Sequence, residues 1–151
     1  MKNKDISILI PTIARPELLL NQLNFYNKFS VDFNIIICDS TPEPDDLFLK
    51  KIKLLSKSLS INYFHKPNLN DRQAGLFLVS SCKTIYSAFI GDDDFFIPEG
   101  LTKSCLFLEK NSEYRIAYGS SIIVDHNSLC NKKSRLIAYE YWGKTCFNQN
   151  N

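Results

Sequence analysis

Several features that commonly reveal a binding site are missing from this sequence of 151 residues. Its five glycines are scattered, so neither the phosphate-binding P-loop nor the glycine-rich turn of dinucleotide-binding domains is present. The five cysteines include no Cys-x-x-Cys pair, and only two histidines accompany them, which argues against a structural zinc site. We expect most cysteines to be reduced, with Cys38 a small apolar residue inside a buried strand.

Long apolar runs are absent too. None approaches the roughly 18 residues that a membrane-spanning helix needs, and the N-terminal run, residues 6–10, is too short for the core of a signal peptide. We therefore expect a cytoplasmic protein, with peripheral association at the inner face of the membrane as the alternative. The net charge of +2 is uninformative about nucleic acid, and we expect no such partner.

Apolar runs alternate with helical patterns along the chain. The length fits one domain, and we treat residues 1–151 as that domain. The alternation predicts an α/β fold with a Rossmann-type, mostly parallel sheet flanked by helices. The expected strands cover residues 6–10, 33–38, 61–64, 85–90 and 114–124, the last interrupted at residues 119–121, and the expected helices begin near residues 16, 45, 73 and 98.

Three adjacent carboxylates, Asp92, Asp93 and Asp94, directly follow the expected strand 85–90 and Gly91. Such neighbours repel one another unless a hard divalent cation or strong hydrogen-bond donors neutralise them. Open α/β sheets bind their ligands at the carboxyl ends of the strands. The acidic run therefore indicates a binding site, and a solvated acidic turn is the simplest alternative.

Two other loops are expected at the same edge of the sheet, because parallel strands point the same way. The first strand ends at Pro11 and Thr12 and is followed by Arg15, and the second strand ends at Asp39. A carboxylate can accept a hydrogen bond from a base or a ribose, and an arginine can contact phosphate through two parallel bonds. Mg²⁺ or Mn²⁺ held by the acidic run can bridge two phosphates. The sequence therefore predicts a site for a nucleoside diphosphate.

Three segments together resemble family two glycosyltransferases, which have the GT-A fold. Residues 8–19 are similar to the opening of that family, residues 35–40 to its second strand with a base-recognising aspartate, and residues 89–98 to its DxD region. The order and spacing of the segments also match. The resemblance covers about residues 5 to 125.

The resemblance implies transfer of a sugar from a nucleotide-diphosphate sugar, commonly a UDP-sugar, to the hydroxyl of a glycan or a lipid-linked acceptor. Carried over to this chain, it places Pro11, Thr12, Arg15 and Asp39 against the nucleotide. Asp92–Asp94 would face the ribose, the metal and the diphosphate. The implied cofactor is Mn²⁺ or Mg²⁺.

The metal ligands depend on how the acidic run is aligned. An alignment on Pro98 places Gly91 where many members carry the first aspartate, whereas the letters themselves make Asp92 and Asp94 the pair, which we prefer. Members often carry an Ala-Arg-Asn segment before the fourth strand. This chain departs from that pattern, and Arg72 is our candidate for the missing positive charge.

Family members usually continue into an acceptor-binding half that holds the general base, and most of that half is missing from residues 1–151. Asp125 and Glu140 are the only late acids, and both are expected to be surface charges. We therefore assign no catalytic residue. The alternatives are an inactive nucleotide-sugar-binding remnant and, least favoured, a receiver-like signalling domain, which would need a lysine after a late strand.

Overall fold

The computed structural model describes residues 5–124 and 136–139. Four β/α units come first, and two further strands follow the last of these helices. In chain order the elements are β1 (Ile6–Thr12), α1 (Pro16–Lys28), β2 (Asn34–Asp39), α2 (Asp46–Leu55), β3 (Ser60–His65), α3 (Asp71–Ser81), β4 (Tyr86–Phe89), α4 (Pro98–Lys110), β5 (Ser121–Val124) and β6 (Leu136–Tyr139).

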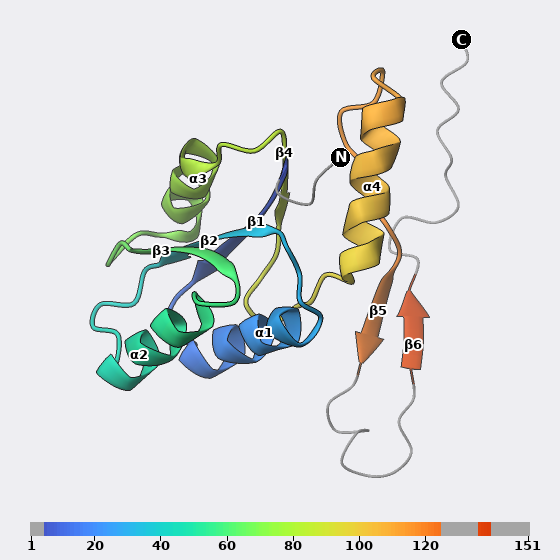
Figure 1. Ribbon diagram of the computed structural model, residues 1–151. Helices are drawn as coiled ribbons and strands as arrows, with labels where there is room; N and C mark the ends of the chain where they lie inside the picture. Colours follow the sequence, from blue (N-terminus) through green and yellow to red (C-terminus); the bar gives the residue numbers. More distant parts are fainter. Residues whose placement is uncertain (1–4, 125–135, 140–151) are drawn as a thin grey trace.

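The first four strands form one parallel sheet in the order β3-β2-β1-β4 (Figure 1). In the register of the two central strands, Thr12 lies opposite Asp39. β4 pairs only with β1, from Ile6 opposite Tyr86 to Leu9 opposite Phe89. Because all four strands are parallel, the residues that follow them meet at one edge of the sheet.

The two central strands are buried on both faces, and alternate side chains enter different parts of the core. Ile8 and Ile10 pack with residues of α1 and α2, whereas Leu9 packs with residues of α3. Figure 1 shows α1 and α2 on one face of the sheet and α3 on the other. This two-sided burial explains why the strands read as continuous apolar runs in the sequence.

Local signals in the sequence define where the helices begin. Pro16 occupies the first turn of α1, where its missing N–H is not needed. The Asp45 side chain caps α2 by accepting a hydrogen bond of 3.1 Å from the Phe48 N–H. Asn70 and Gln73 form a reciprocal capping box at the start of α3.

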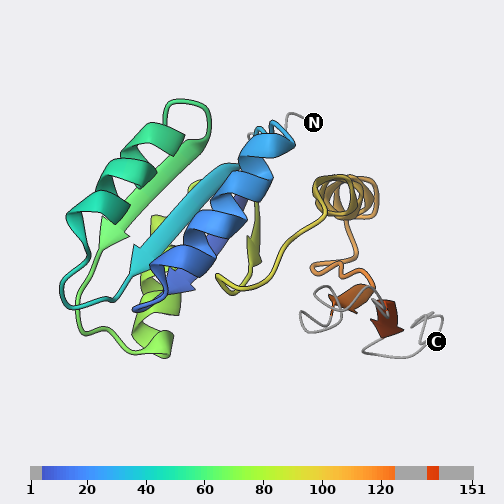
Figure 2. The ribbon, with the colours of Figure 1, turned by 90° about the horizontal axis from the view of Figure 1, so that it is seen from below.

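The region beyond β4 differs from the prediction. We expected a strand over residues 114–124 in the main sheet, but only Ser121–Val124 is a strand, and it pairs antiparallel with β6 in a separate sheet. Gly119 interrupts the segment, and glycine weakens a strand because it has no side chain to pack. α4 and the β5–β6 pair lie beyond the β4 edge of the sheet (Figures 1 and 2).

The remaining fold predictions are confirmed: an α/β architecture, a parallel sheet and flanking helices. Among the described cysteines, Cys38 and Cys105 are buried and Cys82 is half-buried, and all three are free thiols. Within residues 5–124 and 136–139, no helix has the length and apolar character needed to cross a membrane.

The core on the α1 face can be tested with two leucines. Leu23 is fully buried in α1, whereas Leu54 in α2 is 63% exposed. Leu23→Ala should lower the free energy of unfolding by about 2–5 kcal/mol because it removes buried methyl groups and leaves a cavity. Leu54→Ala should change it by less than about 1 kcal/mol. Urea denaturation measures both, and equal losses in the two variants would contradict this packing.

Candidate functional site

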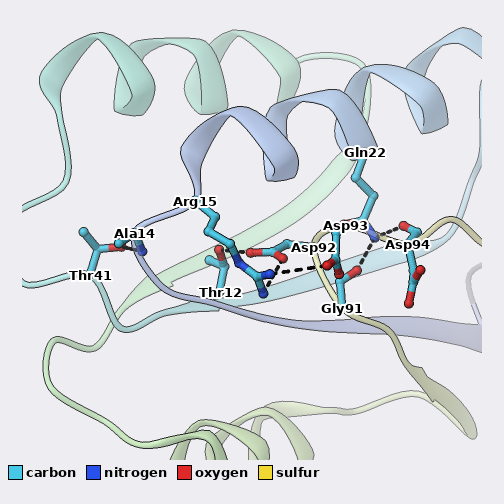
Figure 3. Close-up of polar contacts among 9 residues, drawn as sticks. All are labelled: Thr12, Ala14, Arg15, Gln22, Thr41, Gly91, Asp92, Asp93 and Asp94. Carbon is cyan, nitrogen blue, oxygen red and sulfur yellow. Dashed lines mark hydrogen bonds and ion pairs between the residues drawn. The ribbon is translucent and has the colours of Figure 1, made fainter. Parts of the chain in front are cut away.

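The carboxyl ends of β1, β2 and β4 bring most of the expected site residues together. Thr12 ends β1 and Asp39 ends β2, while Asp92 and Asp93 follow β4. Figure 3 shows Arg15 reaching from the start of α1 toward the acidic run. The three loops therefore form one site, as the sequence predicted for parallel strands.

Asp92 is the buried centre of this site, with no exposed surface. The Thr12 hydroxyl donates a hydrogen bond of 2.5 Å to Asp92 Oδ2. Arg15 Nη2 lies 2.7 Å from Asp92 Oδ1 in an ion pair, although the angles are not those of a hydrogen bond. A buried carboxylate needs such compensation, because removing its charge from water is costly.

The other two carboxylates of the run are exposed. Asp93 pairs with Arg15 at 3.3 Å, and its side chain keeps 53% of its surface exposed. The carboxylate of Asp94 points away from Arg15 (Figure 3). A Cβ on Gly91 would lie 2.8 Å from Asp93 Oδ1 and 3.9 Å from Asp94 Oδ2. The absence of a side chain at Gly91 therefore leaves room for the Asp93 carboxylate, whereas the distance to Asp94 is an ordinary van der Waals contact.

Asp39 belongs to a second hydrogen-bonded group, which lies beside the group formed by Asp92, Thr12 and Arg15. Its Oδ1 accepts hydrogen bonds from the Thr41 N–H, at 2.8 Å, and from the Thr41 hydroxyl. Its Oδ2 accepts a hydrogen bond of 2.5 Å from the Tyr63 hydroxyl in β3. Burial, followed by this contact with Asp39, raises the pKa of Tyr63 well above its ordinary value of 10. Tyr63 therefore donates to Asp39 as a neutral phenol.

The loops after β1 and β2 are tied together through the same residues. The Ser40 N–H donates to the Thr12 carbonyl at 2.9 Å. The Ala14 N–H donates to Thr41 Oγ1 at 2.8 Å, with the Ala14 backbone at a φ of 53°. A left-handed conformation costs a non-glycine residue about 1–2 kcal/mol, and such strain is found most often at functional sites.

A pocket of about 160 Å³ opens between these loops and the start of α2. Asp39 and Arg15 lie on its wall, so the pocket joins the Asp39 group to the acidic run. Its lining residues are Thr12, Arg15, Pro16, Asp39, Thr41, Glu43, Pro44, Asp45 and Phe48.

Three contributors to the site were not predicted: Gln22, Thr41 and Tyr63. Gln22 is a fully buried polar residue of α1, and it contacts the turn of the acidic run. A polar residue on the apolar side of a helix is a signal that could have identified it, because buried polar groups need partners. Thr41 lies two residues after Asp39, and an aspartate that accepts a hydrogen bond from the backbone two residues on is a common local turn. No comparable signal marks Tyr63, because it reaches Asp39 only through the fold.

Two other predicted residues take no part in these contacts. Pro11 lies half-buried inside β1, opposite Cys38. Arg72 is exposed in the first turn of α3, and the described part of the chain shows no hydrogen bond or ion pair from its side chain. The two late acids, Asp125 and Glu140, lie outside the described residues.

No ready-made metal centre is present in the described part of the chain, where no three or more His, Cys, Asp or Glu side chains converge. Mg²⁺, however, is usually held by only one or two carboxylates together with substrate phosphates and water. The exposed carboxylates of Asp93 and Asp94, which follow Gly91, are the candidates for that kind of site.

Comparisons with known proteins agree with the fold and the resemblance. No protein-family model matches the chain. An uncharacterized glycosyltransferase of Rickettsia bellii (strain RML369-C) is 26% identical over 115 residues, which are 74% of this chain and 16% of that protein. The crystal structure of S. aureus TarS matches with a TM-score of 0.58 at 15% identity, over 78% of this chain and 20% of that one. TarS residues 1–349 match with a TM-score of 0.60 at 14% identity, over 80% and 41% of the two chains.

The chain therefore shares the α/β fold of TarS. In sequence, the chain is related to a protein named as a glycosyltransferase. The resemblance to glycosyltransferases is thus confirmed. The chain spans only 16% of the length of its curated relative.

The Tyr63–Asp39 contact makes stability depend on pH. Burial, and then the contact with Asp39, raise the pKa of Tyr63 in the folded protein, so the neutral phenol stabilises the fold below pH 10, the ordinary value, and this contribution is lost as pH rises above it. Tyr63→Phe should lower the free energy of unfolding by about 1.5–3 kcal/mol at neutral pH, because the bond is to a charged group. Above pH 10 its free energy of unfolding should fall less steeply than that of the wild type.

Denaturant unfolding at several pH values gives both quantities. Tyr118→Phe, which removes a phenol that is 61% exposed, is the matched control. Identical pH profiles for Tyr63→Phe and the wild type would show that Tyr63 does not donate to Asp39.

Proposed function

We propose that this domain binds a nucleotide-diphosphate sugar together with Mn²⁺ or Mg²⁺ and transfers the sugar to an acceptor hydroxyl. The observation that carries the proposal is the joint site at the carboxyl ends of the strands. There Asp39 and Arg15 line one pocket, and Asp93 pairs with Arg15 beside it. A UDP-sugar is the proposed donor, and the acceptor is a glycan or a lipid-linked sugar. We also propose a cytoplasmic location, as expected from the sequence.

Asp39 is the proposed contact for the base. A carboxylate offers about four acceptor sites, and the contacts with Thr41 and Tyr63 use three of them. The remaining site, on the Tyr63 side, suits an N–H of the base. Because both partners hold the carboxylate in one orientation, little side-chain freedom is lost when a base binds.

Arg15 is the proposed contact for the diphosphate. Its side chain is 45% exposed, and the guanidinium already lies among carboxylates. The planar guanidinium matches phosphate oxygens through two parallel hydrogen bonds. A diphosphate can therefore take the place of Asp93 as the partner of Arg15, while Asp92 keeps the arginine in position.

Asp93 and Asp94 are the proposed metal ligands. A divalent cation bound there would neutralise negative charge on the diphosphate. Asp92 is assigned a positioning role, because it is buried and already bound by Thr12 and Arg15. This proposal replaces our sequence-based preference for Asp92 and Asp94 as the metal pair.

Calorimetric titration with UDP, in the presence and absence of MnCl₂, tests donor binding. We expect binding that is stronger with Mn²⁺. Asp39→Asn should weaken it at least about tenfold, because it removes a charged acceptor of the base. Asp93→Asn should remove most of the effect of Mn²⁺.

Asp46→Asn is the matched control for both variants, because Asp46 lies in α2 outside the pocket lining and should bind UDP like the wild type. A wild-type protein that binds no nucleoside diphosphate would refute the proposal.

Turnover separates an enzyme from a domain that only binds. Incubation of the protein with a UDP-sugar and Mn²⁺, with released UDP as the readout, should show slow donor hydrolysis, because a bound water can replace the acceptor hydroxyl. The Asp93→Asn variant should release UDP at the background rate. Binding of UDP without any release or transfer would indicate the binding-only alternative.

A further inference from the structure

Gln22 is a buried polar side chain that contacts the turn of the acidic run from outside it. It lies on α1, and its side chain is completely buried. Its Nε2 donates two hydrogen bonds, one of 2.8 Å to the Gly91 carbonyl and one of 2.6 Å to the Asp94 carbonyl (Figure 3). These two carbonyls lie on either side of Asp92 and Asp93, so one amide group holds both ends of the turn.

Within the turn, the side chains of Asp92 and Asp93 contact Thr12 and Arg15, but the backbone of the turn is held only weakly by its own hydrogen bond. Its backbone hydrogen bond, from the Asp94 N–H to the Gly91 carbonyl, is long at 3.4 Å. Tyr26, one helical turn after Gln22, fixes the loop further along by accepting a hydrogen bond of 3.2 Å from the Phe96 N–H. Helix α1 thus anchors this loop at two points, and Gln22 is the point nearest the carboxylates.

The amide of Gln22 also carries an energetic penalty. Its Oε1 is buried without a hydrogen-bond partner in the described structure, and an unsatisfied buried acceptor costs about 1–3 kcal/mol. A methionine of similar shape would fill the same space without that penalty. Buried polar atoms without a hydrogen-bond partner break a general rule of folded proteins, and such exceptions are found chiefly at functional sites. The two hydrogen bonds from Nε2 to the turn offset the cost of the unsatisfied Oε1.

We infer that Gln22 is a positioning residue for the metal and diphosphate half of the site. It sets the turn so that the carboxylates of Asp93 and Asp94 stay on the exposed side, clear of the buried Asp92. The inference rests on the proposed function, since it concerns how the same site holds a cation. Gln22 itself touches neither base nor phosphate in this assignment.

The test compares Gln22→Met with the wild type in UDP titrations, each performed once with MnCl₂ and once with EDTA. The variant should bind UDP about tenfold more weakly with Mn²⁺, because loss of a group that orients metal ligands typically costs 10–100-fold in affinity. Its affinity in EDTA should match that of the wild type, since Asp39 and Arg15 are unchanged. If Gln22 had a purely structural role, the variant would lose affinity for UDP equally with MnCl₂ and with EDTA.

Two further variants make the result interpretable. Leu59→Ala removes a buried leucine just before β3, at the opposite end of the strands, so it controls for lost stability without altering the turn. Gln22→Glu keeps the shape of the side chain but places a carboxylate against the two carbonyls. It should show at least the loss of Gln22→Met, and it serves in its place if the methionine variant does not fold.

The outcomes separate this inference from the proposed function. A wild-type protein that fails to bind UDP, or binds it equally with Mn²⁺ and EDTA, overturns the metal-dependent site and the inference with it. Metal-dependent binding that survives unchanged in the Gln22 variants overturns only the inference. An equal loss in Mn²⁺ and EDTA also overturns it, because it indicates general loosening. A loss confined to Mn²⁺ supports it.

Discussion

The compensation of one buried charge determines how this site is built. Asp92 has no exposed surface, yet it bears a carboxylate that the Thr12 hydroxyl and the Arg15 guanidinium surround. Thr12 ends β1 and Asp92 follows β4, so the contact joins loops that lie 80 residues apart in the chain. If either partner were removed, the buried charge would lose compensation at a cost of several kcal/mol. The positions of Arg15 and Asp93 both depend on this contact.

The parallel sheet is what allows such a contact to form. β1 and β2 run in register to the pair Thr12 and Asp39, and β4 delivers its loop beside them. Tyr63 reaches Asp39 from the next strand, while Gln22 reaches the acidic turn from α1. Each strand of the parallel sheet therefore supplies a residue, or the loop that follows it, to one site on a rigid scaffold. Rigid supports of this kind hold binding groups more accurately than mobile loops do.

The sequence predicted the four β/α units because their signals are local. Apolar runs such as residues 35–38, the Pro16 start of α1 and the acidic start of α2 each require only neighbouring residues. The prediction was wrong for residues 114–124, where periodicity alone could not show which sheet the strand would join. Pairing is a tertiary property, and Gly119 was the one local sign that the apolar segment would not continue as a strand.

The candidate site also has features that the sequence predicts and features that depend on tertiary contacts. The location of Thr12, Asp39 and Asp92 at one edge followed from strand direction, which the alternating pattern fixes. The different environments of Asp92 and Asp93 did not follow, because adjacent identical residues give no sign of which one is buried. Tyr63 acts through one contact across the fold, which has no signature in a sequence without an alignment, whereas Gln22 was marked only by its polarity on the apolar side of a helix.

One consequence concerns the outer strand of the sheet. Among the described strands, β4 pairs on one side only, with β1, and Phe89 at its end is 49% exposed. An unpaired strand edge offers a row of free N–H and C=O groups that another strand can join. All the polar contacts described above lie at the ends of the strands, away from that row of backbone groups. α4 and the β5–β6 pair lie beyond this edge, and a change in what lies there would leave the polar contacts of the site in place.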